Sequence, residues 1–146
     1  MIERILIKPN GERVASPGRE HVRELLHQTY DEWVRGSGDA SLTYVQDEPT
    51  QRYVLLIVPS KEGKFFMEFI DKSNEIYNPF ISLSEGEMSD VEIVIVGAEE
   101  HVLPRITFVS RDLAEDAIVE FLKTGSRSSS VRWARRTEIR WPRSED

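Results

Sequence analysis

The sequence predicts an α+β protein: a mainly antiparallel sheet of about six to eight strands with two amphipathic helices. Apolar residues repeat at helical spacing in two long stretches, and the segments between them show the shorter period of strands. Short turn sequences separate these strand segments, as expected for antiparallel neighbours rather than for strands alternating with helices. With 146 residues, 39% of them hydrophobic, the chain can form one domain spanning residues 1–146.

The first helix is predicted over residues 17–35. Ser16 and Pro17 offer an N-cap and a first helical residue, and side chains then recur at i, i+3, i+4 and i+7 as far as Gly36. The recurring residues are Val22, Leu25, Leu26, Thr29, Tyr30, Trp33 and Val34. Because Trp33 lies within this stripe, we expect it in the core.

The strands are predicted from period-two patterns between clusters of Gly, Pro, Asn, Asp and Ser. Their expected ranges are 2–7, 42–47, 52–58, 64–70, 76–82, 91–96 and 105–109. Two of them, 52–58 and 91–96, carry apolar residues on both faces. A strand of this kind is typically central and covered on both sides, so we expect both to occupy central positions.

The second helix is the most clearly delimited element. Ser110 is a good N-cap and Gly125 a good residue to end a helix, so the helix should run between them. One face is apolar and the opposite face is acidic, which predicts a surface helix lying on a core. The apolar face consists of Leu113, Ala114, Ala117, Ile118, Phe121 and Leu122.

The region after the second helix is predicted to form a last strand or a pair of strands. Val131, Trp133, Ile139 and Trp141 share one parity, whereas Arg132, Arg136 and Arg140 share the other. This pattern predicts inward-facing aromatics and an exposed basic face. A basic C-terminal tail is expected at about residues 134–146.

An FV-S entry, an A…A…FL-TG helix and a short strand that ends in Trp follow one another in the last third of the chain. The residues that carry this pattern are Phe108, Val109, Ala114, Ala117, Phe121, Leu122, Thr124, Gly125 and Trp133. The pattern resembles the C-terminal signature of the Imm1 family of bacterial immunity proteins, although Ala134 stands where the family usually has Glu. The resemblance implies a protein that binds and silences a cognate toxin, with nucleic-acid deaminases and nucleases as candidate toxins.

The net charge of −7 is unevenly distributed along the chain. Residues 1–126 hold 13 basic and 23 acidic side chains, a net charge of −10, whereas residues 127–146 hold 6 and 3, a net charge of +3. An acidic surface attracts cationic proteins and repels nucleic acid over a Debye length of about 8–10 Å. The same charge also favours solubility, which is the simpler interpretation.

Residues 84–100 concentrate acidic side chains without one basic residue. The expected partner-binding residues, in the loops that flank the predicted strand 91–96, are Glu85, Glu87, Asp90, Glu99 and Glu100. Like charges repel, so a turn alone gives no reason to gather them, although a solvated rim remains the alternative. Toxins that act on nucleic acid are cationic where the substrate binds, so these acids could cover a toxin active site.

Other chemistry finds little support in the sequence. The chain has no Cys, and His21, His27 and His101 follow no metal-ligand spacing, so we expect no enzyme, no cofactor and no metal site. Trp133 and Trp141 lie opposite their neighbouring arginines in parity, so we expect no direct binding of nucleic acid.

The N-terminal residues lack the apolar run of a secretion signal and no later run could span a bilayer, which predicts a cytoplasmic protein without membrane contact. The alternative function is a small acidic secretion chaperone or adaptor.

Overall fold

The computed structural model describes residues 1–87 and 89–142 and confirms the α+β class. Its helices are α1 (Arg19–His27), α2 (Tyr30–Arg35) and α3 (Arg111–Thr124). Its strands are β1 (Ile2–Ile7), β2 (Arg13–Ala15), β3 (Ala40–Gln46), β4 (Gln51–Pro59), β5 (Phe65–Asp71), β6 (Phe80–Leu83), β7 (Val91–Val96), β8 (Glu99–Pro104), β9 (Phe108–Val109) and β10 (Arg132–Arg135). Short 3₁₀ turns cover Arg105–Thr107 and Arg136–Glu138.

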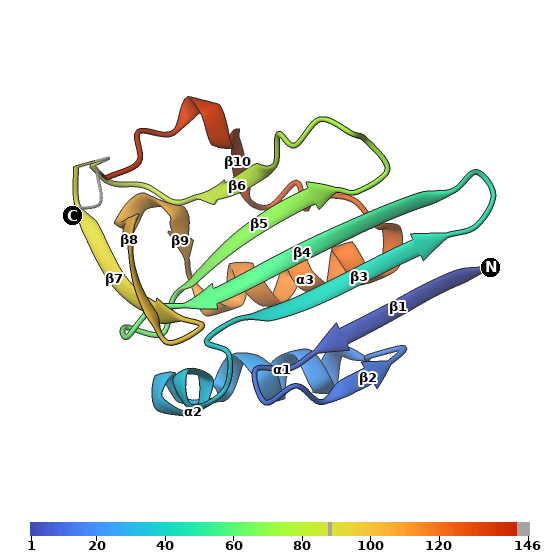
Figure 1. Cartoon of the computed structure of the whole chain (residues 1–146), viewed down its shortest axis with the longest axis horizontal. Coiled ribbons are helices and arrows are strands. Elements are labelled where there is room, and N and C mark those ends of the chain that lie inside the picture. Colours follow the sequence, from blue (N-terminus) through green and yellow to red (C-terminus); the bar gives the residue numbers. More distant parts are fainter. Residues whose placement is uncertain (88, 143–146) are drawn as a thin grey trace.

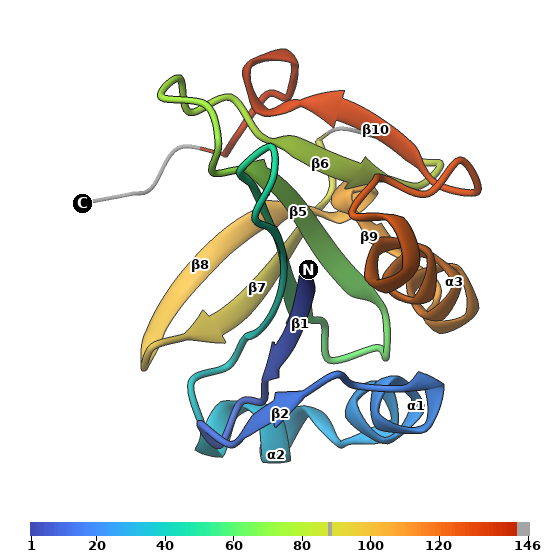
Figure 2. The same cartoon turned by 90° about the vertical axis from the view of Figure 1, so that its right-hand side faces the viewer.

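The main sheet is antiparallel, with the strand order β10-β6-β5-β4-β3-β1-β2, and β9 also pairs with β5 (Figure 1). Strands β7 and β8 form a separate two-stranded sheet, the β7–β8 hairpin. Helices α1 and α3 lie on one side of the main sheet, and the hairpin lies on the other (Figure 2). One face of the main sheet therefore packs against helices, and the other packs against the β7–β8 hairpin.

The larger core lies between the main sheet and the helices. Trp33 is fully buried there, as predicted, and its ring lies 6.1 Å from that of Phe65. Phe121 on α3 contacts Tyr44 and Phe69 edge-to-face. These rings join two strands, β3 and β5, to the helices α2 and α3, because aromatic side chains bury large areas and prefer tilted contacts.

Helix α3 has the ends that the sequence predicts. The Ser110 hydroxyl accepts a hydrogen bond from the Leu113 N–H at 3.3 Å, and Gly125 adopts a left-handed conformation with φ of 72°. Glu115 on α3 binds Arg19 and Arg23 of α1. Burial alone would raise the pKa of Glu115, but the hydrogen bonds and charges of the two arginines outweigh it and lower the pKa below its ordinary value. This cluster ties the two helices together.

A smaller second core lies on the opposite face of the main sheet. It consists of Val58, Phe66, Ile81, Val94, Phe108 and Ile139. The β7–β8 hairpin supplies Val94, and the segment after β10 supplies Ile139. Strand β4 is therefore central, as predicted, but its second face is buried at Val58 and only half-buried at Val54 and Leu56. The hairpin covers only part of that face.

The prediction of one helix over residues 17–35 was wrong. The chain is extended at Gln28 and Thr29, which separates α1 from α2. Thr29 caps α2 by accepting a hydrogen bond from the Glu32 N–H at 3.2 Å. The apolar period continues across this break because both helices face the same core, so the pattern alone did not reveal it. Helix α1 begins at Arg19, with Gly18 rather than Ser16 as its N-cap.

Three strand predictions also need correction. Strand 91–96 is not central: it belongs to the hairpin, and Ile93 is 47% exposed. The strand predicted at 76–82 begins only at Phe80, since Ile76 is 73% exposed and has no strand partner. Residues 105–109 form a 3₁₀ turn and the two-residue β9, and the preceding strand β8 was not predicted. The apolar residues thus indicated which segments favour a strand, but not which other strand each segment would pair with.

Between the end of α3 and residue 142, the chain forms one short strand, β10, followed by a 3₁₀ turn. Arg132, Arg136 and Arg140 are exposed, as predicted, and Ile139 is buried. Trp133 is half-buried and packs against the larger core, while its indole N–H donates to the Ser128 carbonyl at 2.9 Å. The end of the predicted basic tail, residues 143–146, lies outside the described residues.

Candidate functional site

The β7–β8 hairpin carries most of the predicted partner-binding region. Its strands pair from Val91 opposite Pro104 to Val96 opposite Glu99. The two loop residues, Gly97 and Ala98, have φ values of 60° and 65°. Positive φ at both loop residues is what a type I′ turn requires, and this turn matches the twist of paired strands.

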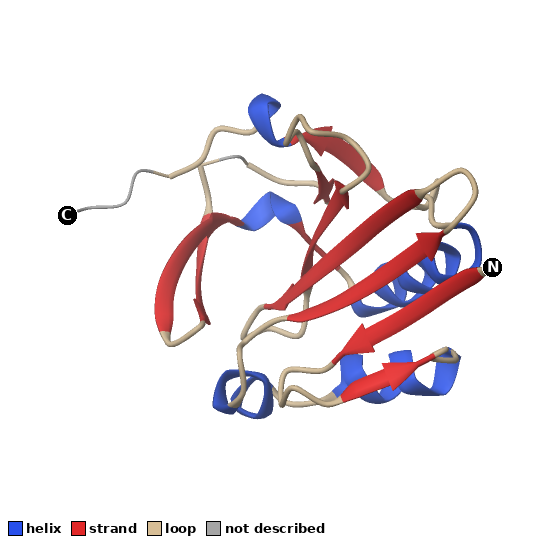
Figure 3. Cartoon of the chain, turned by 45° about the vertical axis from the view of Figure 1, so that its right-hand side comes forward, coloured by secondary structure: helices blue, strands red, loops and turns tan. Residues whose placement is uncertain are grey.

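The tip of the hairpin is anchored to α2 and to the loop that follows it (Figure 3). The Ile95 N–H donates to the Tyr30 hydroxyl at 3.1 Å, and the Gly97 N–H donates to the Ser37 carbonyl at 2.8 Å. Gly38 allows this approach, because a Cβ atom built on it would lie 2.2 Å from the Ile95 carbonyl oxygen. The hairpin is therefore held against the body of the protein and does not project freely.

The base of the hairpin is anchored by Arg105. Its N–H donates to the Asp90 carbonyl at 2.7 Å, and its guanidinium Nε donates to Glu92 Oε1 at 3.0 Å. The Glu92 side chain is only 11% exposed, so the ion pair neutralises it. Residues 84–100 include no basic residue, but Arg105 directly follows β8, and the pairing of β7 with β8 brings it next to Asp90 and Glu92.

The outer face of the hairpin exposes a strip of apolar side chains. Ile93 lies directly opposite Val102, and Val91 follows on the same face. These three side chains are 38–47% exposed, whereas Val94 on the inner face is fully buried. A row of exposed branched side chains on a paired strand is a feature of interaction surfaces.

All five predicted acids are exposed, in two groups. Glu85, Glu87 and Asp90 lie in the loop before β7, at the base of the hairpin. Glu99 and Glu100 lie in strand β8 beside the tip, and not in a loop as predicted. Six strand residues separate the groups by about 20 Å. Glu100 pairs with Ile95 and shares the outer face of the hairpin, whereas Glu99 pairs with Val96 and points to the inner face. The hairpin surface is therefore made of Glu85, Glu87, Asp90, Val91, Ile93, Glu100 and Val102, with Glu99 at its edge beside the tip.

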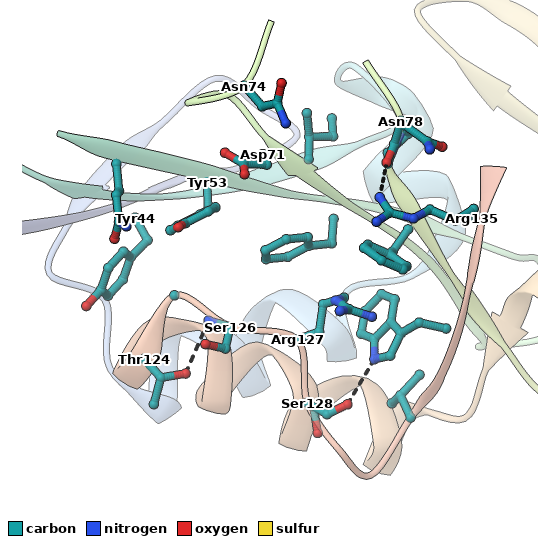
Figure 4. A pocket seen from close by; sticks show the side chains of 18 of the residues that line it. Tyr44, Tyr53, Asp71, Asn74, Asn78, Thr124, Ser126, Arg127, Ser128 and Arg135 are labelled. Carbon is teal, nitrogen blue, oxygen red and sulfur yellow. Dashed lines mark hydrogen bonds between the residues drawn. The ribbon is translucent and has the colours of Figure 1, made fainter. Parts of the chain in front are cut away.

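A second candidate site is a groove of about 850 Å³ on the other side of the main sheet, beside the C-terminal end of α3 (Figure 4). Tyr44, Tyr53 and Phe69 form its aromatic wall, and Arg127 and Arg135 lie at one end. Sequence reasoning missed this site. One feature of the sequence pointed to it: Arg135 has the same parity as the inward-facing Trp133, whereas Arg132, Arg136 and Arg140 have the other.

A buried acid lies on the opposite face of the sheet. Glu68 is 5% exposed and accepts hydrogen bonds from Arg136 at 3.0 Å and from the Tyr77 hydroxyl at 3.2 Å. Burial and the charge of Glu68 raise the pKa of Tyr77, while Arg136 opposes this effect. Arg136 also lies 4.6 Å from the centre of the Trp141 ring. These contacts satisfy Glu68 and fasten the segment after β10 to the sheet.

The family comparison decides which kind of protein this is. The sequence profile described as "Immunity protein Imm1" matches residues 12–135, which is most of the chain. This chain belongs to the Imm1 family of immunity proteins. A comparison with curated protein sequences found no significant match. Within residues 1–87 and 89–142, no helix is long and apolar enough to span a membrane.

The family pattern of this Imm1 protein builds its scaffold. Phe108, Ala114, Ala117 and Phe121 are buried, and Gly125 ends α3. A Cβ atom on Gly125 would lie 2.6 Å from the Tyr44 ring. The residues that carry the resemblance therefore hold α3 on the sheet. For an immunity protein the expected partner is a protein toxin.

Proposed function

We propose that this Imm1 protein neutralises its toxin by covering the toxin active site with the hairpin surface. The observation that carries the proposal is the exposed strip of Val91, Ile93 and Val102 with acidic groups at both ends. Interfaces commonly have an apolar centre and a charged rim, and this surface has that composition. The protein acts as a stoichiometric inhibitor and catalyses no reaction.

The rigidity of the hairpin supports this proposal. Tyr30 and Ser37 hold the tip, and Arg105 holds the base. A surface that is already ordered loses little conformational entropy on binding, so more of the contact energy appears as affinity.

The acidic groups favour a cationic partner. A toxin that acts on nucleic acid, such as a deaminase or a nuclease, presents positive charge where its substrate binds. Glu85, Glu87 and Asp90 at one end and Glu99 and Glu100 at the other would steer such a cleft towards the hairpin and compete with the substrate.

Reversing the charge at the base of the hairpin should slow binding. In the variant Glu85→Lys, Glu87→Lys, Asp90→Lys, we expect the association rate with the cognate toxin to fall about tenfold or more at low salt, because rim charges act mainly on encounter. Stopped-flow association rates at two salt concentrations measure the effect. Protection of toxin-expressing cells should fall in parallel.

The matched control reverses three exposed acids on the helical side: Glu24→Lys, Asp116→Lys and Glu120→Lys. It changes the net charge equally but leaves the hairpin intact. If both variants slowed association equally, the effect would come from the net charge of the protein and not from the hairpin surface. Full protection by a folded hairpin variant would place the interface elsewhere.

Removing the apolar strip should act on dissociation instead. In the variant Ile93→Ser, Val102→Ser, we expect the complex with the toxin to dissociate about ten times faster or more, because buried apolar contacts at the interface centre mainly set the lifetime. Surface plasmon resonance measures this rate. Ile7→Ser is the control, since Ile7 is 39% exposed on β1, outside the hairpin surface. An unchanged dissociation rate in the double variant would exclude the strip from the interface.

A further inference from the structure

The groove beside α3 contains two arginines stacked on one ring. The guanidinium carbon of Arg127 lies 3.5 Å from the centre of the Phe80 ring, and that of Arg135 lies 3.9 Å from it. Two guanidinium groups cannot occupy the same face of a ring at these distances, so they lie on opposite faces. Figure 4 shows Arg127 and Arg135 at the same end of the groove.

Within the described part of the chain, neither guanidinium forms an ion pair. Among residues 1–87 and 89–142, no carboxylate lies within ion-pair distance of the guanidinium group of Arg127 or Arg135, and Glu138 accepts a hydrogen bond only from the Arg135 main-chain N–H, at 2.8 Å. Arg135 donates instead to the Asn78 main-chain carbonyl at 2.9 Å. Burial lowers the pKa of Arg127, and repulsion from the nearby positive charge of Arg135 lowers it further. An anion at the edge of the Phe80 ring, within reach of both groups, relieves this repulsion and finds donors already in position.

The other end of the groove has the opposite charge. Asp71 lies beside Tyr53, away from the two arginines (Figure 4). One of its carboxylate oxygens accepts a hydrogen bond from the Ser73 N–H at 2.8 Å. Between the ends, the Tyr53 and Phe69 rings stack at 5.7 Å and offer an apolar wall. The groove is thus polar at both ends, with unlike charges, and aromatic in the middle.

We propose that this groove binds an acidic peptide segment of a protein partner, with an Asp or Glu side chain of the peptide against Arg127 and Arg135. Guanidinium groups bind carboxylates through paired hydrogen bonds, and the edge of the Phe80 ring between them is also electropositive. A peptide donor group pairs with Asp71, and an apolar residue packs on Tyr53 and Phe69. A nucleic-acid strand fits less well, because its continuous negative charge would meet Asp71 and a chain of net charge −7.

This site is separate from the hairpin surface. Phe69, Phe80 and Arg135 lie opposite one another across β5, β6 and β10, so they share the face that α3 covers. The hairpin packs on the other face through Val94. The proposal therefore goes beyond the function proposed for the hairpin and does not depend on it.

Binding of defined peptide pools tests the proposal. The probes are N-acetylated hexapeptide amides with one position fixed as Glu, Asp, Gln, Asn or Lys and the others randomised, together with a ten-nucleotide oligothymidylate. The full-length protein should bind the Glu and Asp pools roughly tenfold more tightly than the matching Gln and Asn pools. The variant Arg127→Gln, Arg135→Gln should abolish this difference.

The control is Arg132→Gln, because Arg132 lies on the same strand as Arg135 but faces the other way. It should keep the preference for acidic pools. Thermal denaturation verifies folding, and Arg127→Gln alone replaces the double variant if that variant unfolds. Equal binding of acidic and amide pools, or an acidic preference that survives in the Gln variants, would overturn the proposal. Oligothymidylate binding that the same variants abolish would assign the groove to nucleic acid instead.

Discussion

Phe121→Ala is expected to lower the free energy of unfolding by about 3–5 kcal/mol, the usual cost of removing a buried aromatic ring. Phe121 is 1% exposed and contacts both Tyr44 and Phe69, at ring distances of 6.3 and 6.1 Å. Its loss would leave a cavity between α3 and the central strands. Chemical denaturation followed by circular dichroism measures the change.

Leu113→Ala provides the control on the same helix. Leu113 is 36% exposed, so its truncation should cost less than about 1 kcal/mol. A similar cost for both variants would mean that α3 does not pack on the sheet through Phe121.

Gly38→Ala is expected to destabilise the protein by about 2–4 kcal/mol, since it combines backbone strain with overpacking. Gly38 has a φ of 81°, and a Cβ atom there would lie 2.2 Å from the Ile95 carbonyl oxygen. That contact can be relieved only if the hairpin tip moves away. The hydrogen bonds of the Ile95 and Gly97 amides should then open, so both amides should exchange with solvent faster than in the wild type.

Gly11→Ala separates the cost of backbone strain from the cost of overpacking. Gly11 has a similar φ of 88°, but a Cβ atom there meets nothing within 4 Å. This variant should cost only about 1 kcal/mol, the strain of a left-handed residue, and leave the hairpin amides protected. If Gly38→Ala left Ile95 exchange unchanged, the hairpin would not be anchored at this loop.

Displacement of the hairpin also links stability to function. Because Gly38 lies outside the hairpin surface, its replacement changes no residue that we propose to contact the toxin. Faster exchange at Ile95 together with weaker toxin binding would therefore show that the anchoring of the hairpin contributes to affinity.

The sequence by itself determined the elements that local signals define. Ser110 and Gly125 mark the ends of α3, and both act through residues within a few positions of themselves. Short apolar segments between turn signals located β1, β4, β5 and β7, and the class of the fold followed from their order. The family pattern was recognisable for the same reason, since its residues lie close together along the chain and build one buried contact between a helix and the sheet.

Only the tertiary structure decided which segments meet. Residues 91–96 resembled a central strand because their apolar side chains occupy both faces, yet one of those faces packs on the second core and the other remains exposed. The break between α1 and α2 was hidden because both helices face one core. Arg105 neutralises Glu92, and Phe80 brings Arg127 and Arg135 together, through contacts between distant parts of the chain. Periodicity reports the faces of one element, whereas a partner-binding surface depends on strand pairing and packing, and these depend on the whole chain.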